Sequence, residues 1–192
     1  MALRSRVVPP WASPGKSRLA RIGRMTELIV NGAAEQGLTG WLVVAGAPVV
    51  LRYDTGQGYP GPGDPGPAER GASFFGGGDT PLSTLRQSVT LPRRSSQFAV
   101  SAWLGGYASQ QDGARLSVEF LDAGGTPRGL VVLGPVTAEE RSGRTGLVER
   151  SARGTVPPGS RTAVVTLQLT RSGGGTSNDG YADNISFTVG GR

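Results

Sequence analysis

The chain has 192 residues, enough for one domain with a substantial core, and 32 glycines and 14 prolines make up almost a quarter of it. Hydrophobic residues account for 36% and fall in short runs between Gly and Pro, which favours short strands joined by turns over disorder. The net charge of +6 comes entirely from residues 1–24. The other 14 basic and 14 acidic residues balance, so the domain carries no electrostatic footprint for nucleic acid.

Residues 1–24 are predicted to be a disordered basic tail in front of a domain at 25–192. The tail lacks the apolar segment of a signal peptide, and no run in the chain approaches the ~20 residues of a membrane span. Met25 opens the first patterned segment, which favours translation starting there. The sequence thus predicts no membrane contact and a cytoplasmic location by default.

Two residue types that carry much of protein chemistry are missing. The chain has no Cys and no His, which excludes disulfides, thiolate or imidazole zinc sites, and Cys or His acid–base catalysis. The single lysine, Lys16, lies in the tail. Carboxylates, hydroxyls, arginines and aromatic rings remain for any chemistry of the domain.

Short apolar or alternating segments follow one another from about Glu27 to Val189, at nearly regular spacing. Alternation is clearest at 114–121 and 162–170, where apolar residues occupy every second position. The stretch 59–67, YPGPGDPGP, is predicted to be a surface loop, and only 137–144 resembles a helical turn. The predicted strands are 27–30, 41–44, 49–53, 72–75, 83–91, 98–104, 114–121, 130–133, 147–155, 162–170 and 184–189. Nine to eleven strands predict an all-β sandwich or jelly roll.

Short motifs at both ends of the domain carry a family resemblance. Residues 28–32 (LIVNG), followed by Glu35 and Trp41, resemble the opening "N-x-(G)-x-E … G-W" of carbohydrate-binding modules with a galactose-binding-like jelly roll. Residues 181–187 (YADNISF) resemble the closing strand of those modules, and 101–104 and 116–122 resemble their central strands. The sugar-binding domain of certain F-box proteins is similar too. The resemblance implies a jelly-roll β-sandwich that binds a glycan or polysaccharide, commonly outside the cell.

The same resemblance implies a bound calcium ion that pins the first strand to the last. Carried over by position, its ligands are Glu35 and Asp183, with Asn31 and backbone carbonyls. Ca²⁺ takes six to eight oxygen ligands, so this donor set is chemically reasonable. The alternative is that these are turn residues that hydrogen-bond to the backbone.

A sugar site needs an aromatic face and polar groups for hydroxyls, and two loops offer both. Loop 105–113 and loop 173–181 are predicted to converge at one end of the sandwich. Trp41 and Trp103 lie within strand patterns and are predicted to be core. The predicted sugar contacts are Tyr107, Gln110, Asp112, Asn178, Asp179 and Tyr181. The alternative is that the tyrosines cover strand ends and the polar residues are solvated.

The sequence therefore predicts a non-catalytic carbohydrate-binding module, bacterial by its Arg-rich, Lys-poor composition. The alternative is a structural jelly roll, or one that binds a protein partner, without a sugar site. An enzyme would need paired carboxylates, for which Asp112 and Asp179 are the available pair.

Overall fold

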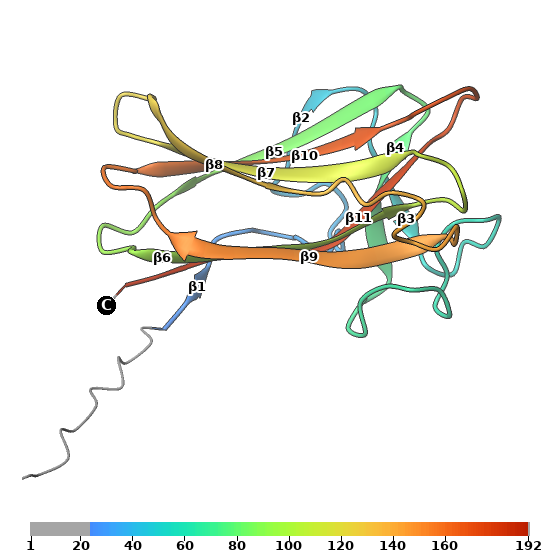
Figure 1. The fold of residues 1–192 in the computed structure, drawn as a ribbon, viewed down its shortest axis with the longest axis horizontal. Helices are drawn as coiled ribbons and strands as arrows, with labels where there is room; N and C mark the ends of the chain where they lie inside the picture. The colour runs from blue at the N-terminus through green and yellow to red at the C-terminus, as the bar shows by residue number, and fades with distance from the viewer. Residues whose placement is uncertain (1–23, 192) are drawn as a thin grey trace, which may run out of the picture.

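The computed structural model describes residues 24–191, which fold into two antiparallel β-sheets packed face to face (Figure 1). The predicted tail lies outside the described residues except for Arg24. The strands are β1 (Thr26–Glu27), β2 (Leu42–Ala45), β3 (Val49–Arg52), β4 (Ser73–Gly78), β5 (Leu82–Thr90), β6 (Gln97–Gly106), β7 (Gly113–Leu121), β8 (Pro127–Leu133), β9 (Gly146–Thr155), β10 (Thr162–Thr170) and β11 (Asn178–Gly190). The predicted all-β jelly-roll sandwich is confirmed.

The strand order defines two layers, which we name sheet A and sheet B. Sheet A has the order β3-β4-β11-β6-β9, with β1 also paired to β11, and sheet B has the order β2-β5-β10-β7-β8. Connections such as β6 to β7 and β10 to β11 pass from one sheet to the other, and Figure 1 shows them gathered at one end of the molecule. Within the part described, the chain has no helix suited to crossing a bilayer; residues 137–144 form only a turn, as expected.

Three strand boundaries differ from the prediction for reasons of pairing. β1 ends at Glu27, whose carboxylate accepts the backbone N–H groups of the next two residues, while the Leu28 N–H also still bonds to the Phe187 carbonyl of β11. β4 runs on through its glycines because Gly76 pairs with Tyr181 of β11. A side chain at Gly77 would collide with Asn178, so this pairing requires glycine there. β11 is correspondingly longer and includes residues 178–179, which were predicted to be loop.

The main core lies between the sheets and takes the apolar face of each alternating strand. Along β10, Ala163, Val165, Leu167 and Leu169 are fully buried, as the alternation predicts. Trp41 joins this core, edge-on to Phe75 with ring centroids 5.5 Å apart, so its predicted core position is confirmed.

A second, smaller apolar cluster lies on the outer face of sheet A, under the segment 53–72 that joins β3 to β4. Its buried members are Tyr53, Phe74, Leu147 and Tyr181. Trp103 packs half-buried against this cluster, so its predicted place in the main core is wrong. The Pro- and Gly-rich segment, teal in Figure 1 and below sheet A, is therefore a cover for that sheet.

Candidate functional site

The loops 105–113 and 173–181 meet at one end of the sandwich, where Asp112 joins them. The Asp112 side chain is 2% exposed, and its two carboxylate oxygens accept the backbone N–H groups of Ser172 (2.7 Å) and Asp179 (2.8 Å). A buried carboxylate needs such donors to offset its lost hydration. The hydrogen bonds of Asp112 thus connect the two loops to each other.

Two further predicted sugar contacts are also part of this framework. Asn178 is buried; its amide nitrogen donates to the carbonyls of Thr80 and Leu169, and its amide oxygen accepts the N–H of Gly180. Tyr181 is buried, and its hydroxyl donates to the Asp179 carboxylate at 2.8 Å. With their polar atoms engaged inside the protein, Asp112, Asn178 and Tyr181 are not available to a sugar in this structure.

The other predicted contacts lie on different sides of the loop end. Tyr107 is half-buried toward sheet A, where its ring lies against Gly58 of the covering segment. Gln110 is exposed, and Asp179 is half-buried with one oxygen taken by Tyr181. The six residues therefore do not form a single contact surface.

Arg141 fixes the shape of loop 105–113 from beneath. Its side chain is buried, and its guanidinium donates to the carbonyls of Gly106, Ala108 and Arg144 through Nη1 and of Gln110 through Nη2. Burial lowers the pKa of Arg141, although the group stays a cation because an arginine pKa starts so high. One buried cation thus binds three carbonyls of loop 105–113 and the carbonyl of Arg144, and so links the two segments.

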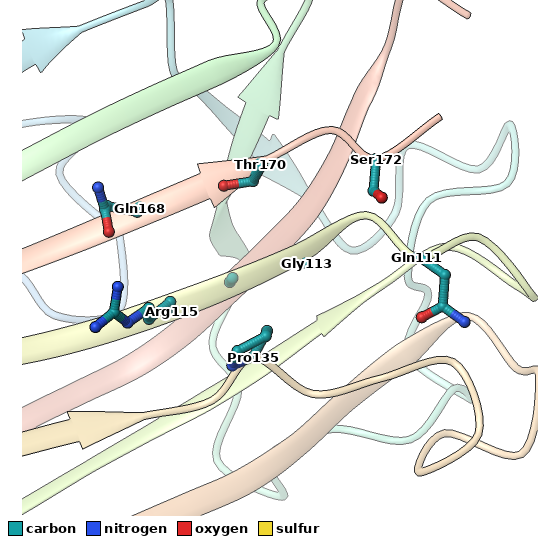
Figure 2. Close-up of a pocket in the computed structure, with 8 residues that line it drawn as sticks. Gln111, Gly113, Arg115, Pro135, Gln168, Thr170 and Ser172 are labelled. Carbon is teal, nitrogen blue, oxygen red and sulfur yellow. The ribbon is translucent and has the colours of Figure 1, made fainter. Parts of the chain in front are cut away.

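A pocket of about 310 Å³ opens beside the joined loops, on the outer face of sheet B (Figure 2). Arg115 of β7 and Gln168 of β10 are cross-strand partners at one end of it, and Gln111 and Ser172 lie at the other. Its lining residues are Gln111, Gly113, Ala114, Arg115, Pro135, Gln168, Thr170 and Ser172. The volume falls at the lower end of the range for small-molecule sites.

The surface of the pocket is mostly apolar, and hydrogen-bonding groups are placed around it. Amide, hydroxyl and guanidinium groups of five side chains face it, and Pro135 adds an apolar wall. Sugars present hydroxyl groups that both donate and accept, and amides and hydroxyls match both roles. No aromatic ring lines the pocket, so any sugar here is held by polar contacts rather than by stacking.

Gln111 of loop 105–113 lines the pocket, but none of the six predicted sugar contacts does. Gln111 and Ser172 belong to the connections at this end, whereas Arg115, Gln168 and Thr170 are strand residues. A signal for the strand residues was present, because the alternation of β7 and β10 directs them away from the core. Asp112 and Asn178, in contrast, could not be recognised as framework without the fold, because their partners are distant in sequence.

The predicted calcium ligands lie where the first turn, the covering segment and β11 meet. Asn31 is in a left-handed turn conformation (φ 54°), its amide nitrogen donates to two carbonyls and its amide oxygen accepts the N–H of Gln36. Its side chain is thus a turn brace, as the alternative interpretation has it, and does not fit the role of an ion ligand.

Asp183 and Glu35 fit that role better. One oxygen of Glu35 accepts the N–H groups of Ala72 and Ser73. Asp183 is fully buried on β11, where its carboxylate accepts the Tyr53 hydroxyl at 2.7 Å and the N–H of Asn184. The pKa of Asp183 is raised to about 7, mainly by burial and to a smaller extent by the charge of Glu35, against the lowering effects of these hydrogen bonds and of Arg70. Residues 24–191 hold no group of three or more Asp, Glu, His or Cys side chains arranged for a metal.

Comparison with solved structures supports the jelly-roll fold. A family 16 carbohydrate-binding module matches with a TM-score of 0.58 and 22% identity over 83% of this chain and 98% of that one. A family 61 module, solved in complex with β-1,4-galactotriose, matches with a TM-score of 0.55 and 18% identity over 84% of this chain and 97% of that one. At such identities the likeness shows the fold that this chain shares with carbohydrate-binding modules.

The same fold occurs inside a much larger protein. The enzymatically active domain of a tailspike protein of bacteriophage CBA120 matches with a TM-score of 0.61 and 13% identity over 85% of this chain. This chain spans only 21% of that one. No protein family and no curated protein matches the sequence.

Proposed function

We propose that this domain binds a glycan without catalysing a reaction, and that the pocket on sheet B holds part of the sugar. The observation that carries the proposal is the pocket itself: five hydrogen-bonding side chains around about 310 Å³, at the end where the two predicted loops join. Structural neighbours that are carbohydrate-binding modules, one solved with a galactotriose, support the choice of ligand class.

The carboxylates at this end support binding rather than hydrolysis. A glycosidase needs two carboxyl groups that flank the scissile bond and reach the substrate. Asp112, however, is buried with both oxygens bonded to backbone amides, and Asp179 holds the Tyr181 hydroxyl. The pocket lining contains no carboxylate. The proposed site therefore offers groups that hold a sugar and none that would act as its acid or nucleophile.

A glycan array, followed by affinity electrophoresis on the polysaccharides that score, tests the proposal. We expect retention by at least one glycan, and we expect Gln168→Ala to weaken that binding by roughly three- to tenfold, the loss of about one hydrogen bond. The matched control is Gln97→Ala, the same change at an exposed residue at the start of β6, the end of that strand that lies away from loop 105–113. Absence of binding to any glycan, or equal loss in both variants, would contradict the pocket as the site.

A second part of the proposal is a Ca²⁺ ion held by Glu35 and Asp183, with carbonyl groups and water completing the shell. The support is electrostatic: the charge of the exposed Glu35 acts on the buried Asp183, and Arg70, whose charge also acts on Asp183, is engaged with backbone carbonyls of the covering segment. A divalent ion would offset the cost of ionising Asp183 and so stabilise the fold. It would take no part in contacts with the sugar pocket.

The stability of the protein against pH, with chelator and with millimolar Ca²⁺, tests this ion. Above pH 7 Asp183 is ionised in the fold, so we expect Ca²⁺ to raise the unfolding temperature there and to have little effect near pH 4, where the carboxyl is protonated. If neither Ca²⁺ nor chelator changed the unfolding temperature at pH 8, the proposed ion would be ruled out.

A further inference from the structure

The charge of the pocket points to a narrower ligand class than glycans in general. We infer that the pocket takes an acidic sugar, a uronic acid residue whose carboxylate pairs with Arg115. This inference rests on the proposed glycan-binding function and adds to it the chemical type of the sugar.

Arg115 is the single charged residue that lines the pocket, and no carboxylate lies on the lining with it. Ion pairs occur elsewhere in residues 24–191, at Arg52–Asp54, Arg128–Asp122 and Arg150–Glu140, and none of them includes Arg115. Arg115 is exposed, and it forms no ion pair within the part of the chain that the structure describes. A neutral sugar would leave that charge unpaired, whereas a uronate carboxylate would pair with it.

The guanidinium of Arg115 suits a planar carboxylate. Guanidinium groups bind carboxylates through two parallel N–H donors, and such charge-assisted bonds are stronger than neutral ones. Gln168 lies directly opposite on β10, one strand spacing of about 4.8 Å away, with its amide oxygen on the side of Arg115 (Figure 2). At this end of the pocket the carboxylate would therefore pair with the guanidinium, and Gln168 would be free to bond to a hydroxyl of the sugar.

The opposite end of the pocket has charges of both signs behind it. Gln111 donates from its amide nitrogen to the Glu139 carboxylate at 3.1 Å, and Glu139 in turn interacts with the buried Arg141. Arg115 is the charged residue on the lining itself. We therefore place the acid group of the sugar between β7 and β10, with its hydroxyls toward Gln111 and Ser172.

Titration calorimetry on the whole chain tests the inference with oligomers of galacturonate, mannuronate and glucuronate and with the methyl esters of the same oligomers. The ester keeps the shape and removes the charge. We expect at least one acid form to bind roughly tenfold or more tightly than its ester, the gain expected for a charge-assisted hydrogen bond. Arg115→Gln should remove this preference, and Arg115→Lys should retain part of it. Added salt should weaken binding of the acid more than binding of the ester.

The matched control is Arg86→Gln, which removes the same charge from the same sheet face but outside the pocket lining. It should leave the preference intact, which separates an ion pair in the pocket from general attraction. Equal binding of acid and ester, or a preference that survives Arg115→Gln, would overturn the inference and leave glycan binding standing. If only sulfated galactan oligomers bound, the pocket would recognise a sulfate group, and the inference of a uronate carboxylate would be wrong. Binding of no glycan at all would overturn both the inference and the proposed function.

Discussion

The two outer faces of the sandwich are both formed by antiparallel strands, but one is covered by another segment of the chain and the other is exposed to solvent. The outer face of sheet A carries Phe74, Leu147 and Tyr181 and is covered by segment 53–72. The outer face of sheet B carries threonines, serines, glutamines and arginines together with the exposed Leu130 and Val132, and it stays open, with the pocket at one end. Only the main core between the sheets is common to both.

The contrast shows what the Pro- and Gly-rich segment is for. It is held to sheet A by the Pro65 carbonyl, which accepts the N–H of Leu147, and by the Glu69 carbonyl, which accepts the side-chain amide of Asn184. Arg70 braces it internally and stacks over the Tyr53 ring at 5.0 Å. The outer face of sheet A is stabilised by the packing of segment 53–72 on it, whereas the outer face of sheet B remains accessible to a ligand.

The largest expected effect separates the two faces by stability. Phe74→Ala would empty part of the covered cluster and should lower the free energy of unfolding by about 3–5 kcal/mol. Leu130→Ala, on the outer face of sheet B where Leu130 is 60% exposed, should cost about 0.5 kcal/mol or less. Chemical denaturation of both variants measures the difference. Similar losses at the two positions would show that the segment 53–72 is not a packed cover.

Much of the fold could be predicted because alternation is a local property of the sequence. β7 and β10 alternate strictly and match their predicted ranges within one residue. The boundaries that failed depend on residues far away: Gly76 is a strand residue because Tyr181 pairs with it. The covered face is not predicted for the same reason, since the composition of 59–67 does not reveal that Tyr59 packs against Tyr181.

The candidate site was predictable only at the level of loops. Connections at one end of a sandwich must lie near one another, and this placed loops 105–113 and 173–181 together. Whether a polar side chain in such a loop faces solvent or the framework depends on backbone donors supplied by the other loop, as with Asp112. The orientation of side chains on the outer face of sheet B follows from the alternation of each strand. The outward positions of Arg115 and Gln168 could therefore be predicted from the sequence.

The second largest expected effect is a pH dependence of stability that comes from Asp183, the buried carboxyl group on the covered side of the sandwich. The pKa of Asp183 is raised to about 7 in the fold, against about 3.9 in an unfolded chain. A raised carboxyl pKa means that the fold holds the proton more tightly, so its stabilising contribution is complete below pH ~4 and is lost as the pH rises to about 7, a change of about 2–4 kcal/mol.

Asp183→Asn isolates this contribution, because other carboxyls titrate equally in both proteins. In the presence of chelator, the stability difference between the wild type and the variant should shift between pH 4 and 7 in favour of the wild type at the acidic end. Denaturation at a series of pH values measures it. A difference that is constant across this range would mean that water or an ion reaches the carboxylate and that this face is less closed than its packing indicates.

The smallest expected effect on stability belongs to the open face and its loops. Asp112→Ala leaves the N–H groups of Ser172 and Asp179 without an acceptor and should cost about 1–3 kcal/mol. Because Ser172 lines the pocket, we also expect weaker glycan binding, measured by calorimetry, while the near-ultraviolet circular dichroism of the tyrosines under segment 53–72 is retained. Asp112→Asn keeps one acceptor oxygen and should show a smaller loss of both stability and affinity. If the dichroism changed together with the affinity, the two faces would be coupled through the strand ends; if the dichroism held while affinity fell, the open face would be an independent binding surface on a rigid sandwich.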